Sequence, residues 1–392
     1  MTVQVSLEEG MRLRRLHLGK AKRLVVKVGS AVLTADNGLN MTVLENLARD
    51  ISFVYESGRE VILVSSGAVA AGRKRLDFVS AKTISLREKQ AVAAVGQSSL
   101  MRAYEDIFNR FGRKVAQVLL THDDLSHRDR YLNVRNTMLT LLDWSILPII
   151  NENDTVSVEE LRFGDNDTLG AMITNVIEAD MFICLTDVDG LFTGNPRLDK
   201  NARPVYTVAR VDKTIRAMAG NVYGALGTGG MRSKIDAAAA VAARGGCSFI
   251  GPGRQPDIIR KVFGSEQIGT FFLPRPDKMQ SRKHWIAYVL RPQGNLVLDE
   301  GACRALVKGG KSLLPSGIVA VRGKFKVGAP VQCIDEAGRA IASGLTNYAA
   351  ADLEKIKGRR SSQIEDILGF KDSDEVIHRD NLVISESLQE TY

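Results

Sequence analysis

The sequence of 392 residues lacks the hydrophobic runs and cysteine patterns that mark several classes of protein. No apolar run approaches the roughly 20 residues that a helix needs to cross a bilayer, so no membrane association is predicted. The four cysteines, Cys184, Cys247, Cys303 and Cys333, are far apart and form no C-x-x-C pair. This spacing argues against a zinc knuckle or a disulfide framework and favours a reducing cytoplasm.

Two nucleotide-binding signatures are also missing. The chain holds neither G-x-x-x-x-G-K-[ST] nor G-x-G-x-x-G. Their absence removes the P-loop and dinucleotide-binding interpretations.

A secretory signal is not expected either. Residues 12–23 carry six basic side chains, but Glu8 and Glu9 precede them and no apolar segment follows. We interpret residues 1–20 as a flexible N-terminal extension.

The net charge of +8 is unevenly distributed along the chain. Residues 28–274 carry 28 basic and 28 acidic side chains. Residues 275–371 carry 17 basic and 9 acidic side chains, and residues 372–392 carry 1 basic and 6 acidic side chains. A basic stretch with two prolines over residues 273–283 marks the boundary. The predicted organisation begins with a flexible extension (residues 1–20), a catalytic domain (21–273) and a linker (274–283). A small β domain (284–371) and an acidic tail (372–392) follow.

The first 270 or so residues alternate short β-branched runs with longer helical patterns. The segment Thr42–Glu56, for example, repeats apolar residues at helical spacing after an N-cap candidate at Asn40 or Thr42. Buried strands are predicted at Leu24–Val28, Val61–Ser65, Val115–Leu120, Ile146–Ile150, Met181–Thr186 and Ser248–Ile250. The alternation predicts a three-layer α/β/α sandwich with a mostly parallel sheet, in which ligands lie beyond the carboxyl ends of the strands.

From about residue 284 the pattern changes to short strands with frequent glycines and few helices. The strands are predicted at Trp285–Leu290, Asn295–Leu298, Gly317–Val321, Pro330–Ile334 and Ala340–Leu345. This texture predicts a compact, mostly β module.

A glycine-rich segment, Gly227–Lys234, precedes an alanine-rich helix predicted over Ile235–Arg244. Its backbone N–H groups, the helix N-terminus and the lysine together suit an anion such as phosphate. An ordinary loop before a helix has a similar pattern, so the neighbouring motifs decide between the two interpretations.

Two predicted strands end in residues that suit anions. Lys27 and Gly29 end the first strand, where the ammonium would face the ligand crevice and the glycine would let a phosphate approach the backbone. Ser66 and Gly67 follow the second strand and open a helix, which suits a carboxylate. A lysine that merely extends to solvent, and a plain turn before a helix, are the structural alternatives.

Acidic and amide side chains cluster after two further strands. Asn151–Thr155 and Gly164–Thr168 offer hooks for the amino and carboxylate groups of a small zwitterion, although such residues are also common in turns. Asp187 and Asp189 could hold Mg²⁺ indirectly or orient lysines. With the lysines and helix starts at the same sheet edge, these motifs favour phosphoryl transfer, which depends mainly on positioning and charge neutralisation.

These motifs, in this order, resemble those of the amino acid kinase family, in its glutamate-phosphorylating branch. They are Lys27–Ser30, Ser65–Ala68, Asn151–Asp154, Gly164–Asp167, Thr186–Asp187 and Gly227–Lys234. The resemblance spans about residues 22–272, and the C-terminal part resembles a PUA domain. It implies ATP-dependent phosphorylation of the side-chain carboxylate of L-glutamate, the first step toward proline, with Mg²⁺ bound to ATP and no protein residue assigned as a metal ligand.

The resemblance also implies roles for individual residues. Lys27 and Lys234 would neutralise the transferring phosphoryl group, and Asp167 would organise the two lysines. Glutamate would be held by Ser66, Gly67, Asp154 and Asn166. The nucleotide would be held by Lys27, Gly29, Ser30, Thr186, Asp187, Thr228, Gly229, Gly230, Met231 and Lys234.

Partners and competing functions follow from the same comparison. Feedback inhibition by proline, a homo-oligomer, and a separate glutamyl phosphate reductase to consume the labile product are expected. One alternative is an RNA-binding role for the basic C-terminal module. Another is a sister kinase acting on aspartate, N-acetylglutamate or a nucleoside monophosphate.

Overall fold

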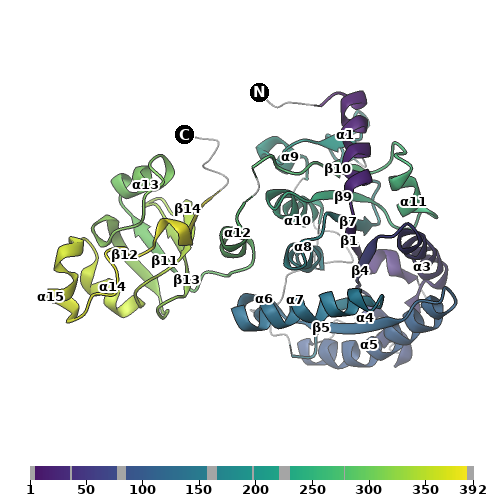
Figure 1. Ribbon diagram of the computed structural model, residues 1–392, viewed down its shortest axis with the longest axis horizontal. Coiled ribbons are helices and arrows are strands. Elements are labelled where there is room, and N and C mark those ends of the chain that lie inside the picture. The colour runs from purple at the N-terminus through teal and green to yellow at the C-terminus, as the bar shows by residue number, and fades with distance from the viewer. Residues whose placement is uncertain are drawn as a thin grey trace. The chain divides into compact units, whose positions relative to one another are not determined.

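The computed structural model of the chain describes residues 5–35, 38–76, 85–156, 166–196, 198–219, 230–277 and 279–385. The chain divides into two compact units, Met1–Lys278 and Met279–Tyr392 (Figure 1). None of the helices in these ranges is long and apolar enough to cross a membrane.

The first unit is built on an eight-stranded sheet with the order β5-β6-β4-β1-β7-β9-β10-β8 in the described residues. Its strands are β1 (Arg23–Val28), β4 (Glu60–Val64), β5 (Val115–Leu120), β6 (Leu147–Glu152), β7 (Met181–Thr186), β8 (Thr207–Val208), β9 (Cys247–Pro252) and β10 (Thr270–Phe272). All neighbours pair in parallel except β9 and β10. Each strand predicted for this sheet is confirmed, because strands buried on both faces are nearly continuous apolar runs.

Helices cover both faces of this sheet. Those of the first unit are α1 (Leu7–Lys20), α2 (Ser30–Leu33), α3 (Met41–Glu56), α4 (Ala68–Arg75), α5 (Leu86–Asn109), α6 (His122–Ser126), α7 (Arg128–Asp143), α8 (Asn166–Val176), α9 (Lys213–Met218), α10 (Met231–Ala243) and α11 (Ile258–Phe263). In Figure 1, α8 and α10 lie on one side of the central strands and α3 and α11 on the other. The predicted three-layer sandwich is therefore confirmed. A small separate sheet pairs β2 (Thr34–Ala35) with β3 (Gly38–Leu39).

Local sequence sets the start of α3 and the depth of α8. The side chain of Asn40 accepts a hydrogen bond from the Val43 N–H at 3.2 Å, so Asn40 is the N-cap of α3.

A Cβ on Gly170 of α8 would lie 2.6 Å from the Phe182 ring on β7. Because Gly170 has no side chain, α8 packs close to the sheet. The first turn of α8 therefore lies near the ends of β1 and β7.

The N-terminal extension is not flexible over residues 7–20, and that expectation was wrong. Ser6 caps α1 by accepting a hydrogen bond from the Glu9 N–H. Arg14 and Leu18 are buried, and Arg14 Nη2 donates to the Ile268 carbonyl at 3.0 Å. One basic side chain of the extension thus packs into the unit.

The second unit holds a five-stranded sheet with the order β12-β11-β13-β14-β15 in the described residues. Its elements are α12 (Ser281–Tyr288), β11 (Gly294–Leu298), α13 (Glu300–Val307), η2 (Pro315–Gly317), β12 (Ile318–Gly323), β13 (Pro330–Ile334), β14 (Ala340–Leu345), α14 (Ala350–Ile356), η3 (Ser361–Gln363), α15 (Ile364–Leu368), η4 (Arg379–Asn381) and β15 (Leu382–Ile384). A mostly β second domain is confirmed.

Two expectations for this unit were wrong. The segment 285–290 lies mostly in α12, where Ile286 is buried, and is not a strand; the C-cap residue Val289 is buried on the same helical spacing. The acidic tail contributes β15, which pairs antiparallel with β14. Short apolar segments are ambiguous between helix and strand, and the negative charge of the tail concealed the apolar Leu382–Ile384.

Candidate active site

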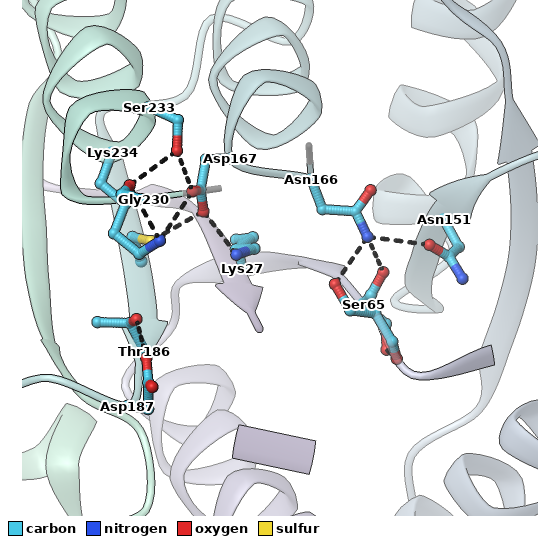
Figure 2. A network of polar contacts seen from close by, with 12 residues as sticks. Lys27, Ser65, Asn151, Asn166, Asp167, Thr186, Asp187, Gly230, Ser233 and Lys234 are labelled. Carbon is cyan, nitrogen blue, oxygen red and sulfur yellow. Dashed lines mark hydrogen bonds and ion pairs between the residues drawn. The ribbon is translucent and has the colours of Figure 1, made fainter. Parts of the chain in front are cut away.

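Three charged side chains meet at the carboxyl edge of the first sheet. Lys27 lies at the end of β1, Asp167 in the first turn of α8 and Lys234 in the first turn of α10. Lys27 Nζ is 2.5 Å from Asp167 Oδ1, and Lys234 Nζ is 3.0 Å from Asp167 Oδ2. Figure 2 shows the carboxylate between the two ammonium groups. We call these three residues the lysine–aspartate cluster.

The lysine–aspartate cluster is buried and carries a net positive charge. The side chains of Lys27, Asp167 and Lys234 are 7%, 1% and 8% exposed. Burial raises the pKa of Asp167, but the charges and hydrogen bonds of the two lysines outweigh burial and hold the pKa well below its ordinary value. Two lysines and one aspartate give the cluster a formal net charge of +1. Such a site favours an anion.

Two neutral groups also contact Asp167, and neither contact was predicted from the sequence, although Ser233 lies within the predicted Gly227–Lys234 motif. Ser233 Oγ donates to Asp167 Oδ2 at 2.9 Å, and Cys184 Sγ donates to Asp167 Oδ1 at 3.3 Å. Burial raises the pKa of Cys184 to about 12, so the group is a thiol and a donor. Cys184 on β7 is the register partner of Lys27 on β1. The register of β1 with β7, which was not predicted from the sequence, is what places Cys184 beside Lys27.

A second polar cluster lies beside the first and begins at the same helix. Asn166 Nδ2 donates to the Ser65 carbonyl and to Ser66 Oγ, both at 2.8 Å, and lies 3.1 Å from Asn151 Oδ1. Figure 2 shows Asn166 turned toward Ser65 and Asn151, while its neighbour Asp167 is turned toward the lysines. The first turn of α8 therefore joins the two clusters.

The remaining residues predicted to hold a substrate, Gly67 and Asp154, follow β4 and β6, the two strands whose ends Asn166 contacts. Gly67 is the N-cap of α4 and has a φ of 98°, in the left-handed region that favours glycine. Asp154 lies in the turn after β6 and is half-buried. Asn151 Nδ2 donates to Gln97 Oε1 at 2.9 Å, which ties the end of β6 to α5.

The residues predicted to hold a nucleotide lie at the ends of β1 and β7 and at the start of α10. The Gly29 N–H donates to the Leu185 carbonyl at 3.1 Å, and a Cβ on Gly29 would lie 3.6 Å from Lys27 Nζ. Thr186 Oγ1 donates to Asp187 Oδ1 at 3.1 Å.

Other predicted nucleotide residues lie on helices beside these ends or outside the described part. Ser30 begins α2, Gly230 is the N-cap of α10, and Met231 is the first residue of α10. Thr228 and Gly229 lie outside the described residues.

Family comparison agrees with this geometry. A model of the amino acid kinase family matches residues 22–250, which include all three residues of the lysine–aspartate cluster. The chain belongs to the amino acid kinase family. A model of the PUA domain matches residues 294–368 of this amino acid kinase family member, so the predicted second domain is a PUA domain.

Three curated relatives of this family member carry the same enzyme name. The glutamate 5-kinase of Desulfotalea psychrophila is 57% identical over 374 residues, which cover 95% of this chain and 100% of the relative. The glutamate 5-kinase of Syntrophotalea carbinolica is 49% identical, with coverage of 95% and 100%. That of Geobacter sulfurreducens is 48% identical, with coverage of 94% and 98%. The resemblance drawn from the sequence motifs is confirmed.

Proposed function

We propose that this protein transfers the γ-phosphoryl group of ATP to the side-chain carboxylate of L-glutamate, forming L-glutamyl 5-phosphate. The reaction is the first step of proline biosynthesis. The observation that carries the proposal is the buried lysine–aspartate cluster, in a chain that is 57% identical to a glutamate 5-kinase over nearly its whole length.

The geometry suits a carboxylate acceptor. A carboxylate is already a nucleophile, so no general base is needed, and the main barrier is repulsion between two anions. Lys27 and Lys234 place two ammonium groups where they can neutralise the transferring group. Asp167 is not a base in this scheme. Its lowered pKa keeps the carboxylate ionised, and four donors already occupy its two oxygens.

We assign the two clusters at the start of α8 to the two substrates. Glutamate would bind at Asn166 with Ser66, Gly67 and Asp154, next to the lysine–aspartate cluster. The nucleotide residues would be Lys27, Gly29, Ser30, Thr186, Asp187, Thr228, Gly229, Gly230, Met231 and Lys234. Because Asn166 and Asp167 are consecutive, a glutamate held by one lies close to the charges organised by the other.

Mg²⁺ fits this site as a partner of the ATP phosphates. The described residues contain no group of three or more His, Cys, Asp or Glu side chains that could hold a metal ion. Asp187, at the end of β7, offers a hard carboxylate oxygen to the water shell of the ion. Mg²⁺ would supply further neutralisation of phosphate charge.

Further expectations accompany this proposal. A cytoplasmic location agrees with the four free cysteines in the described residues. The acyl phosphate product is labile, which favours a separate reductase as the next enzyme. Inhibition by proline at the glutamate site and assembly into a homo-oligomer stay predictions from the resemblance.

A substrate panel tests the proposal. ADP release is measured with MgATP and hydroxylamine, which traps the acyl phosphate, in the presence of L-glutamate, L-aspartate or N-acetylglutamate. We expect ADP release and hydroxamate formation with glutamate well above the other two acceptors. Equal rates with all three, or a higher rate with another acceptor, would contradict the proposal.

A further inference from the structure

Each carboxylate oxygen of Asp167 contacts one charged and one neutral donor. Oδ1 is 2.5 Å from Lys27 Nζ and 3.3 Å from Cys184 Sγ. Oδ2 is 3.0 Å from Lys234 Nζ and 2.9 Å from Ser233 Oγ. Asp167 and Cys184 are fully buried, so water does not compete for these contacts.

In the proposed reaction, Lys27 and Lys234 each have two roles. Each lysine must keep Asp167 ionised and also direct N–H groups at the phosphoryl oxygens. As the phosphoryl group gains these bonds, the lysines hold Asp167 less firmly. A buried carboxylate that loses donors is penalised by several kcal/mol or takes up a proton. Neutral donors that stay in place limit this penalty.

Ser233 has a second acceptor within reach, which makes it suited to such a role. Its Oγ lies 2.9 Å from Asp167 Oδ2 and also 2.9 Å from the Gly230 carbonyl. A hydroxyl carries one proton and donates to one acceptor at a time. Lys234 Nζ reaches the same two acceptors, at 3.0 Å and 3.5 Å. Two donors therefore share two acceptors.

We propose that Ser233 and Cys184 are positioning residues that hold the Asp167 carboxylate in place while Lys27 and Lys234 turn toward the transferring phosphoryl group. When Lys234 turns, the Ser233 hydroxyl keeps its hydrogen bond to Asp167 Oδ2 and does not donate to the Gly230 carbonyl. Cys184 holds the other oxygen of Asp167 in the same way. The inference rests on the phosphoryl transfer proposed above, but not on the identity of the acceptor.

The two residues are not expected to contribute equally. A hydroxyl at 2.9 Å is a stronger donor than a thiol, and Ser233 also precedes Lys234 directly in α10. Removing a hydrogen bond to a charged group costs about 1.5–3 kcal/mol, which corresponds to a factor of roughly 10 to 100. The Ser233 effect should therefore reach at least the lower end of this range, and the Cys184 effect should be smaller.

The test separates kcat from KM in four variants. We expect Ser233→Ala to lower kcat about tenfold while KM for ATP and for the acceptor changes less than about twofold. Ser233→Thr, which keeps the hydroxyl, should retain most of kcat. Cys184→Ala should lower kcat about threefold, and Cys184→Ser should restore it. A purely structural role would not give this split or this rescue.

Control variants come from buried residues elsewhere in the unit. Cys247→Ala removes a buried thiol on β9 that faces the Asp180 carbonyl. Ser52→Ala removes a buried hydroxyl on α3 that has no hydrogen-bond partner in the part of the chain that the structure describes. Both should keep wild-type kcat. Thermal unfolding of every variant shows whether a loss of activity merely follows a loss of stability.

Several outcomes would overturn the inference. These are an unchanged kcat in Ser233→Ala, a change confined to KM, no rescue by Ser233→Thr, or losses of kcat that match those of the controls. If the wild-type protein prefers aspartate or N-acetylglutamate, the proposed substrate is wrong, and the same kcat comparison on that acceptor still decides the positioning role. Absence of transfer to all three acceptors would contradict both proposals.

Discussion

The region around Asp167 and the region around Asp50 each bury one carboxylate in the first unit, on opposite faces of its sheet. Asp167 begins α8, and Asp50 lies in α3, which packs with α11 (Figure 1). The side chains of Asp167 and Asp50 are 1% and 2% exposed. Their pKa values nevertheless move in opposite directions, downward for Asp167 and upward to about 6 for Asp50.

The partners of the two carboxylates explain this difference. Asp50 Oδ2 accepts a hydrogen bond from the Ile259 N–H at 3.0 Å, while its Oδ1 has no hydrogen-bond partner among the described residues and lies 3.9 Å from Arg260 Nε. Burial therefore dominates and raises the pKa of Asp50. Asp167 has two lysines within 3.0 Å. Burial alone thus does not mark a functional carboxylate, whereas burial with paired cations at a strand end does.

Replacement of Asp167 should have the largest effect. Asp167→Asn leaves two buried ammonium groups without an anion and removes the group that aligns them. We expect kcat to fall on the order of 10³-fold and the free energy of unfolding to fall by about 3–5 kcal/mol. The hydroxamate assay and urea denaturation measure the two losses. Near-normal turnover in this variant would place the lysine–aspartate cluster outside the chemistry and erase the contrast with Asp50.

Removal of one cation from each region should give a smaller but more selective effect. Lys234→Ala should lower kcat by about 10²-fold with little change in KM for ATP, because the charge is needed most as the phosphoryl group moves. Arg260→Ala, beside Asp50, is the matched control and should leave kcat unchanged. Initial rates at varied ATP separate the two constants. Normal turnover with weakened ATP binding in Lys234→Ala would show the assignment to be wrong.

The sequence was sufficient for the parts of the site that lie directly after strands. Lys27 could be placed because a buried parallel strand is an apolar run, and its last polar residue faces the ligand edge. Ser233 and Cys184 could not be assigned a partner, because their contacts with Asp167 depend on how close α8 approaches the sheet. That approach is set by Gly170 against the Phe182 ring, a distance that no sequence pattern gives.

The same limit explains what was missed in the fold. The segments that form α12 and β15 are short, so their apolar residues fit the spacing of a helix as well as that of a strand. Packing against the rest of the unit determines which of the two forms. The burial of Asp50 was not predicted, because a single acidic residue inside an amphipathic helix normally faces solvent. Its burial follows from the docking of α11, whose Ile259 N–H donates to it. Long-range packing, rather than local propensity, accounts for each of these cases.

The Asp50 region gives the smallest expected effect, on stability alone. Since the pKa of Asp50 is raised from its ordinary value of 3.8 to about 6 in the folded protein, the folded state binds the proton more tightly than the unfolded chain. The stability that this proton contributes is fully present below about pH 4 and is lost as the pH rises through 6. At about 1.4 kcal/mol per pKa unit, the loss is at most roughly 3 kcal/mol.

Asp50→Asn removes this titration while keeping an oxygen that can accept from the Ile259 N–H. The unfolding free energies of the two proteins are compared by urea denaturation at pH 4.5 and pH 7.5. We expect wild type to lose more stability than the variant over this interval, with kcat unchanged in the variant. The amide group that the substitution introduces adds an offset that is independent of pH, so only the change in the difference between the two proteins reports the carboxylate charge. A difference that stays constant with pH would mean that Asp50 is ionised without penalty, and burial would then not be what separates it from Asp167.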